Sequence, residues 1–110
     1  MNYALIILLA TLQSSAVEVW TGGDDGLTQR FASLFRTTTQ QIQTNDRSHR
    51  IRAVVEQITP RRRGKVHVVV TFHREGERIG IIRCTAIEDN LARCAARASA
   101  AAERLIANVQ

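Results

Sequence analysis

Aromatic residues, proline and long apolar runs are all scarce in this sequence. Only 5% of the 110 residues are aromatic, so a core must be built mainly from Val, Ile, Leu and Ala. One proline and 45% hydrophobic residues exclude a collagen-like or intrinsically disordered chain. No run of about 18 or more apolar residues occurs, which excludes an ordinary membrane-spanning helix. The length suits one domain and excludes most enzymes built of several parts.

The common signatures of catalysis and of metal binding are also missing. The sequence has no Ser/His/Asp arrangement, no phosphate-binding glycine loop and no HExxH motif. We interpret His49, His67 and His73 as surface or strand residues. Cys84 and Cys94 form no CxxC motif. His67 and His73 lie too far apart on one predicted strand to bind the same zinc ion. We therefore expect no enzymatic activity, no cofactor and no metal.

Residues 1–16 contain no charged side chain and have the features of a cleavable signal peptide. A dense apolar run, Ala4–Ala10, is followed by small and polar residues. Ser14 and Ala16 place small side chains at the two positions that a signal peptidase reads. We expect cleavage after Ala16 and a periplasmic or secreted protein. A buried N-terminal strand or helix is the alternative.

The remaining chain is expected to form an α+β fold. Residues 17–26 are glycine-rich and acidic, which predicts a flexible leader before a single domain over 27–110. The domain should begin with a helix over 27–44, capped by Asp24 or Asp25. Helical spacing places on one face of this helix the residues Phe31, Leu34 and Phe35.

Residues 48–58 allow two interpretations. Their apolar residues fit helical spacing: Ile51, Val54, Val55 and Ile58. The same β-branched side chains suit a strand equally well. We favour a short helix that ends before Pro60, with a third strand for the sheet as the alternative.

The clearest pattern is an antiparallel β-hairpin over 65–73 and 78–85. Apolar side chains alternate along its first strand and would share one face: Val66, Val68, Val70 and Phe72. Pairing His73 with Arg78 across the turn places Ile81 on that same face. A two-stranded hairpin is only marginally stable, so we expect a third strand from this chain or from a partner.

A helix over 86–108 is expected to cover this apolar face. It should open with a capping box, Thr85–Glu88, and continue as an apolar stripe. We expect one buried cluster of Val68, Val70, Phe72, Ile81, Leu91 and Cys94. Cys84, at the end of the hairpin, is within reach of Cys94, so we expect a disulfide formed in an oxidising compartment. Two reduced, buried thiols are the alternative.

One part of the chain has a pattern typical of a known family. Its residues are the predicted strand Gly64–Phe72, the turn at Glu75–Gly76, and Ile79, Ile81, Leu91, Ala95 and Ala96. This pattern, over about residues 64–103, resembles the C-terminal domain of TonB and TolA proteins. TolA domains tie the sheet to this helix by a disulfide, which Cys94 would match. The resemblance implies a non-enzymatic binding or adaptor module of the cell envelope that pairs with another polypeptide along a sheet edge.

Positive charge is concentrated in the middle of the chain. Residues 47–74 carry eight basic side chains and one acidic one, whereas the segments before and after them are acidic or balanced. We expect 47–65 to form one exposed surface that binds anions through Arg47, Arg50, Arg52, Arg61, Arg62, Arg63 and Lys65. Its partner would be an envelope protein, anionic lipid or lipopolysaccharide. If the protein is not exported, the same segment would bind nucleic acid in the cytoplasm; a solvated turn without a partner is a third interpretation.

Overall fold

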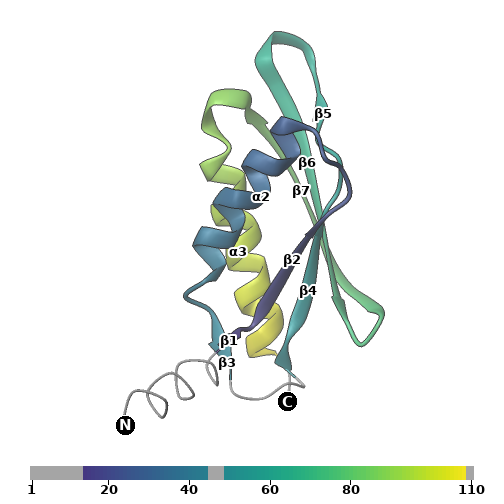
Figure 1. Cartoon of the computed structure of the whole chain (residues 1–110), viewed down its shortest axis with the longest axis vertical. Coiled ribbons are helices and arrows are strands. Elements are labelled where there is room, and N and C mark those ends of the chain that lie inside the picture. Colours follow the sequence, from purple (N-terminus) through teal and green to yellow (C-terminus); the bar gives the residue numbers. More distant parts are fainter. Residues whose placement is uncertain (1–13, 45–48, 109–110) are drawn as a thin grey trace, which may run out of the picture.

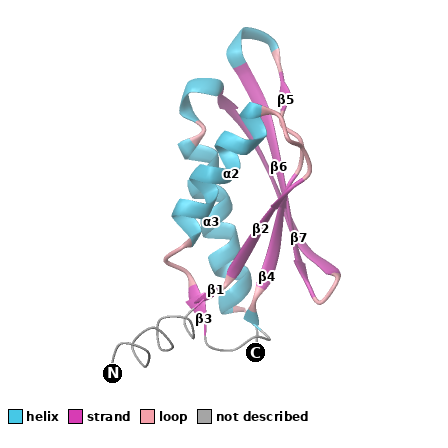
Figure 2. Cartoon of the chain, viewed as in Figure 1, coloured by secondary structure: helices cyan, strands magenta, loops and turns pink. Residues whose placement is uncertain are grey.

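The computed structural model describes residues 14–44 and 49–108, which form an α+β fold of two helices on one mixed sheet. The helices, α2 (Gly26–Thr39) and α3 (Ala92–Ala107), lie side by side against the same face of the sheet (Figure 1). The main strands lie in the order β2 (Val17–Thr21), β4 (Ile51–Val55), β6 (Lys65–Arg74) and β7 (Glu77–Ile87). Helices and sheet thus form two layers (Figure 2).

Three short strands complete the described structure. The strand β5 (Thr59–Pro60) pairs with the beginning of β6, and β4 pairs with its end. Away from the main sheet, β1 (Ser14–Ser15) pairs with β3 (Gln43–Thr44). The long strand β6 is therefore the centre of the sheet, since β7 pairs along its other side.

The prediction of a flexible leader over 17–26 is wrong for its first half, because residues 17–21 form β2. This strand pairs in parallel with β4, and α2 supplies the crossover that a parallel pair needs. Val17 is buried against the helices, whereas Trp20 on the opposite face is exposed. The sheet is therefore mixed and not wholly antiparallel as expected. Glycine and acid content hid a period-two pattern that was present in the sequence.

The first helix is confirmed, with a different end and a different buried face. Asp25 caps it by accepting a hydrogen bond from the Thr28 N–H at 3.0 Å, and this bond and one from the Thr28 hydroxyl lower the pKa of the carboxyl. The helix ends at Thr39 and not at residue 44. Phe31 and Phe35 are fully buried, but Leu34 is 37% exposed because the contact face follows Phe31 to Phe35 along the helix axis.

Residues 51–55 form strand β4, so the favoured helix over 48–58 is wrong and the strand alternative is right. Ile51, Ala53 and Val55 are buried, while Arg52 between them is exposed. Both edges of β4 are paired, with β2 on one side and β6 on the other. Those ladder hydrogen bonds are tertiary, which is why periodicity within the segment did not reveal them. The expected third strand of the sheet is β4.

The hairpin of β6 and β7 is confirmed, including the pairing of His73 with Arg78. An irregularity follows that pair, so that Phe72 lies opposite Gly80 and Val70 lies opposite Ile82. Ile81 is therefore turned to the other face and is 38% exposed, contrary to the expectation that it is buried. Leu105 packs against Gly80 in the space that a side chain at this position would need. Its Cδ1 atom lies 3.1 Å from where the Cβ of a larger residue would be.

The last helix begins at Ala92, later than the predicted residue 86. The proposed capping box does not form, because β7 continues to Ile87 and Thr85 pairs with His67. The carboxylate of Glu88 instead lies 3.5 Å from Arg30 on α2. Leu91, Cys94 and Ala98 of the expected apolar stripe are buried, whereas Ile87 is 57% exposed. Ala95 and Ala102 are buried with them in the core. Among the described residues, no helix is long and apolar enough to cross a membrane.

Candidate anion-binding surfaces

A turn of basic residues projects from one end of the sheet. We call residues 61–65 the arginine turn; it joins β5 to β6 at the upper end of the molecule in Figure 1. The N–H of Arg61 donates to the Lys65 carbonyl at 2.7 Å, and the Lys65 N–H donates back to the Arg62 carbonyl. Arg63 and Gly64 both adopt left-handed backbone conformations, with φ of 60° and 70°. The backbone of the turn is thus closed on itself.

The side chains of the arginine turn face solvent. Its four cations are all exposed: Arg61, Arg62, Arg63 and Lys65. None of them forms an ion pair with a described residue. The nearby Glu88 is paired with Arg30 and not with the turn. Four uncompensated positive charges on one projecting turn create a field that attracts anions.

The other predicted basic residues lie at the opposite end of the sheet. Arg52 is exposed on β4, where its Nε lies 3.8 Å from the carboxylate of Glu18. Arg50 is half-buried just before that strand, and Arg47 lies outside the described residues. Both described arginines line a cavity of about 410 Å³ whose other charged residues are Glu18 and Glu75. Two carboxylates balance two guanidinium groups in the lining of this cavity, in contrast to the arginine turn.

The predicted surface over 47–65 is consequently divided. Arg52 pairs with His73, and Lys65 begins the same strand eight residues earlier. At about 3.3 Å per residue, some 26 Å separate the two groups along β6. The six described residues of the predicted surface therefore form no single contiguous surface for nucleic acid or lipid. The arginine turn alone keeps the exposure and the unbalanced charge that anion binding requires.

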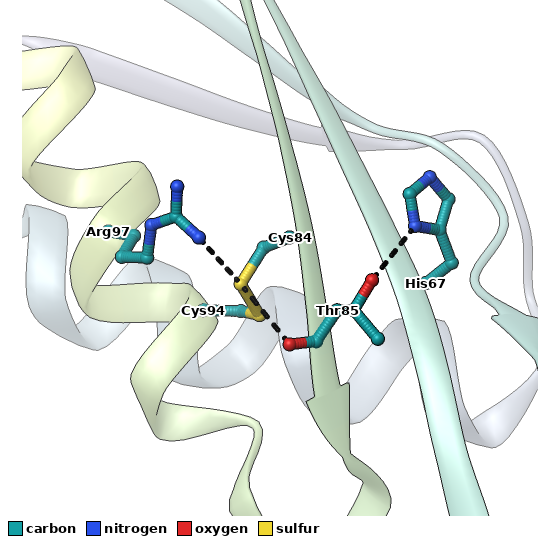
Figure 3. The surroundings of a disulfide bond; sticks show 5 residues. All are labelled: His67, Cys84, Thr85, Cys94 and Arg97. Atoms are coloured by element: carbon teal, nitrogen blue, oxygen red, sulfur yellow. Dashed lines mark hydrogen bonds between the residues drawn. A yellow bond between two sulfur atoms is a disulfide. The ribbon is translucent and has the colours of Figure 1, made fainter.

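The predicted disulfide is present and joins the sheet to α3 (Figure 3). The Cα atoms of Cys84 and Cys94 lie 5.8 Å apart, and both residues are buried. On one side Arg97 donates to the Cys84 sulfur at 3.7 Å. On the other side of β7, the Nδ1 atom of His67 lies 3.5 Å from the Thr85 hydroxyl. The pair is a structural link between the two layers and leaves no free thiol.

His67 and His73 have local partners within the sheet. The Nε2 atom of His73 lies 3.0 Å from the Thr71 hydroxyl, and His67 contacts Thr85 as above. Over residues 14–44 and 49–108, no three His, Cys, Asp or Glu side chains come close enough to hold a metal ion.

The sequence suggested Trp20 as a docking anchor or a mere leader residue, but it did not indicate that Trp20 shares a sheet face with Ile81. Trp20 and Ile81 both lie on the sheet face away from the helices, where they are 48% and 38% exposed. Alternation in the segment Val17–Thr21 would have placed Trp20 outward had the segment been recognised as a strand. The outward position of Ile81 had no sequence signal, because it depends on the irregular pairing after His73.

Comparison with known proteins adds no family. The chain matches no protein-family model and no curated protein. One solved structure, titled "Crystal structure of uncharacterized protein", is similar at 16% sequence identity with a TM-score of 0.43. That similarity covers 87% of this chain and 84% of the other.

Proposed function

We propose that this is a small exported cell-envelope protein, a non-enzymatic binding module that contacts phosphate-bearing anionic surfaces through the arginine turn. The observation that carries the proposal is the set of four exposed cations on a projecting turn, none paired with a described carboxylate. Guanidinium groups suit this partner because their planar fork binds two phosphate oxygens at once. Phospholipid and lipopolysaccharide are the envelope molecules that present such groups.

The backbone at Arg63 supports a role for its side chain. A non-glycine residue in the left-handed region costs about 1 kcal/mol relative to glycine. Arg63 has φ 60° and ψ 40°, and its side chain is exposed. Glycine would adopt this conformation without that strain. An arginine that the fold does not need is consistent with one that a partner needs.

Replacing all three arginines of the turn tests the proposal. In the variant Arg61→Gln, Arg62→Gln, Arg63→Gln, we expect binding to phosphatidylglycerol vesicles to fall by at least about tenfold at low salt. The melting temperature should change by no more than about 2 °C, because the side chains are exposed and unpaired. Vesicle co-sedimentation and calorimetry give the two values. A parallel titration with lipopolysaccharide identifies which phosphate source binds more tightly.

A matched variant removes the same charge elsewhere. Arg93, Arg97 and Arg104 are exposed on α3, so their replacement by Gln lowers the net charge equally. We expect this variant to lose less than about threefold in binding, since long-range charge is screened. Equal losses in the two variants would show that only net charge matters. Unchanged binding in the turn variant would show that the arginine turn is a solvated loop.

The single substitution Arg63→Gly separates binding from folding. Glycine relieves the left-handed strain, so the melting temperature should stay equal or rise by a few degrees, about 4 °C per kcal/mol at this size. Vesicle binding should nevertheless fall, because one guanidinium is lost. Calorimetry measures the melting temperature of this variant, which should not fall, and co-sedimentation measures its vesicle binding, which should fall. A rise in stability with undiminished binding would remove Arg63 from the proposed contact.

The export part of the proposal predicts a mature chain that begins at Val17. Ala16 is buried, its N–H donates to the Ile42 carbonyl at 2.8 Å, and its carbonyl accepts from Ile51 at 2.9 Å. Cleavage after Ala16 therefore removes these contacts but leaves β2 whole. Intact mass of the protein from its native host, taken after fractionation, gives the first residue. Full-length chain in the cytosol would contradict export. A mature protein whose first residue lies before Ser15 would contradict cleavage after Ala16, because it would keep the Ala16 hydrogen bonds.

A further inference from the structure

The two helices leave one face of the sheet open (Figure 2). On that face a mostly apolar row crosses all four main strands. Trp20 pairs with Val54, Val54 with Thr71, and Thr71 with Ile81. The ends of the row, Trp20 and Ile81, are 48% and 38% exposed, whereas Val54 is half-buried and Thr71 is 9% exposed. No described helix lies on this face. The side chains at the two ends of the row therefore project further into solvent than those in its middle.

Trp20 is held in position before any partner arrives. The guanidinium carbon of Arg52 lies 3.8 Å from the centre of the indole ring, within cation–π range. The indole Nε1–H donates to the carboxylate of Glu18, which in turn lies 3.8 Å from the Arg52 Nε. A fixed, half-exposed tryptophan loses little conformational entropy on binding, and tryptophan is the residue most enriched among binding hot spots.

Positive side chains flank the apolar row on both sides. The adjacent row on one side consists of Glu18, Arg52, His73 and Arg78. On the other side, Arg83 pairs with Val69. Glu56 lies beside Val69 in this row, so three arginines border the apolar row against two carboxylates, and one of these, Glu18, already contacts Arg52. Arg78 and Arg83 are exposed, and neither forms an ion pair with a described residue.

We propose that this open face docks an acidic amphipathic helix of a partner protein. Its axis follows the strands between Trp20 and Ile81, with its apolar stripe over Val54 and Thr71 and its carboxylates toward Arg52, Arg78 and Arg83. Three strand spacings separate Trp20 from Ile81, about 14 Å, which accommodates a helix about 10 Å across. The other face of the same sheet is already covered by helices, so this packing geometry suits its twist. This surface is separate from the arginine turn and does not depend on the function proposed for that turn.

Two other occupants fit the observations less well. A second copy of the chain would place three arginines against three arginines with only two carboxylates from each partner, and the excess of like charge opposes association. A flat bilayer would touch Trp20 and Ile81 but not Thr71, which lies below them at 9% exposure. A cylinder that carries negative charge along its flanks fits both the shape and the charge of the face.

The sole tryptophan makes the proposal directly measurable, because Trp20 fluorescence reports on the docking face alone. The probes are two synthetic helical peptides of about 15 residues with identical leucine stripes, one flanked by Glu and the other by Lys. We expect the Glu peptide to shift Trp20 emission to shorter wavelength in a saturable way. The Lys peptide should bind at least about tenfold more weakly. Absence of a saturable shift with the Glu peptide, or equal binding of both, would overturn the proposal.

Matched variants place the binding on this face. Ile81→Ser should weaken Glu-peptide binding by at least about fivefold, whereas Leu34→Ser, with the same exposure on α2, should leave it unchanged. Arg83→Glu should reverse the preference toward the Lys peptide, and the arginine-turn variant should retain the preference for Glu. Equal effects of the serine variants would place the contact elsewhere and overturn the proposal. So would a Trp20 shift caused by anionic vesicles or by self-association in place of the Glu peptide.

Discussion

Removal of the disulfide is expected to lower the melting temperature by at least about 10 °C. The bond between Cys84 and Cys94 closes a loop of about 11 residues, worth about 3 kcal/mol on the chain-entropy model. Its two ends belong to the sheet and to α3, so its loss frees the helix that covers the hairpin. The variant Cys84→Ala, Cys94→Ala measures the effect by calorimetry. Alanine is chosen because both positions are buried and a serine hydroxyl would be desolvated there.

A second measurement separates the bond from the packing of the sulfur atoms. Wild-type protein in reducing agent keeps both sulfur atoms and loses only the bond, so it should melt close to the double-alanine variant. A large gap between these two samples would assign the stability to packing. If oxidised and reduced wild type melt within about 3 °C of each other, the link contributes little to the fold.

The substitution Phe31→Ala is expected to destabilise the domain by about 3–5 kcal/mol. Phe31 is fully buried on α2, and its ring centre lies 6.0 Å from that of Phe35. The cavity would lie between the helix and the sheet, where rigid strands cannot collapse to fill it. Since small domains have about 5–15 kcal/mol of stability in total, much of the chain should unfold. Urea unfolding followed by circular dichroism measures the change.

Leu34→Ala on the same helix provides the matched control. This residue is 37% exposed, so its truncation should cost less than about 1 kcal/mol. A cost at Phe31 below about 1.5 kcal/mol would contradict its place in the core. Comparable costs at the two positions would mean that the buried face of α2 is not the one described.

Several elements followed from the sequence because their signals are local. The alternation over 65–73 and the turn at Gly76 place the hairpin correctly, since side-chain period and turn chemistry belong to consecutive residues. A cap at Asp24 or Asp25 was foreseen for the same reason, and the structure selects Asp25. The cysteine pairing also followed, because it needed only that the last helix cover the hairpin.

The candidate surfaces were foreseen only in part. The sequence indicated a basic segment over 47–65 but not that 26 Å or so would separate its halves, since distance along a sheet depends on which strands pair. The apolar row from Trp20 to Ile81 was not foreseen. Its four residues come from four strands, and no spacing along the chain relates them.

By itself, the sequence determined the α+β composition, the central hairpin, an aspartate cap for the first helix and the only pairing open to its two cysteines. Only the tertiary structure decided that 51–55 is a strand, that 17–21 joins the sheet in parallel, and that Ile81 faces away from the core. Each of these rests on backbone hydrogen bonds to residues distant in the chain. Local propensity for Ile51–Val55 is nearly equal between helix and strand, so the ladders offered by β2 and β6 determine the outcome.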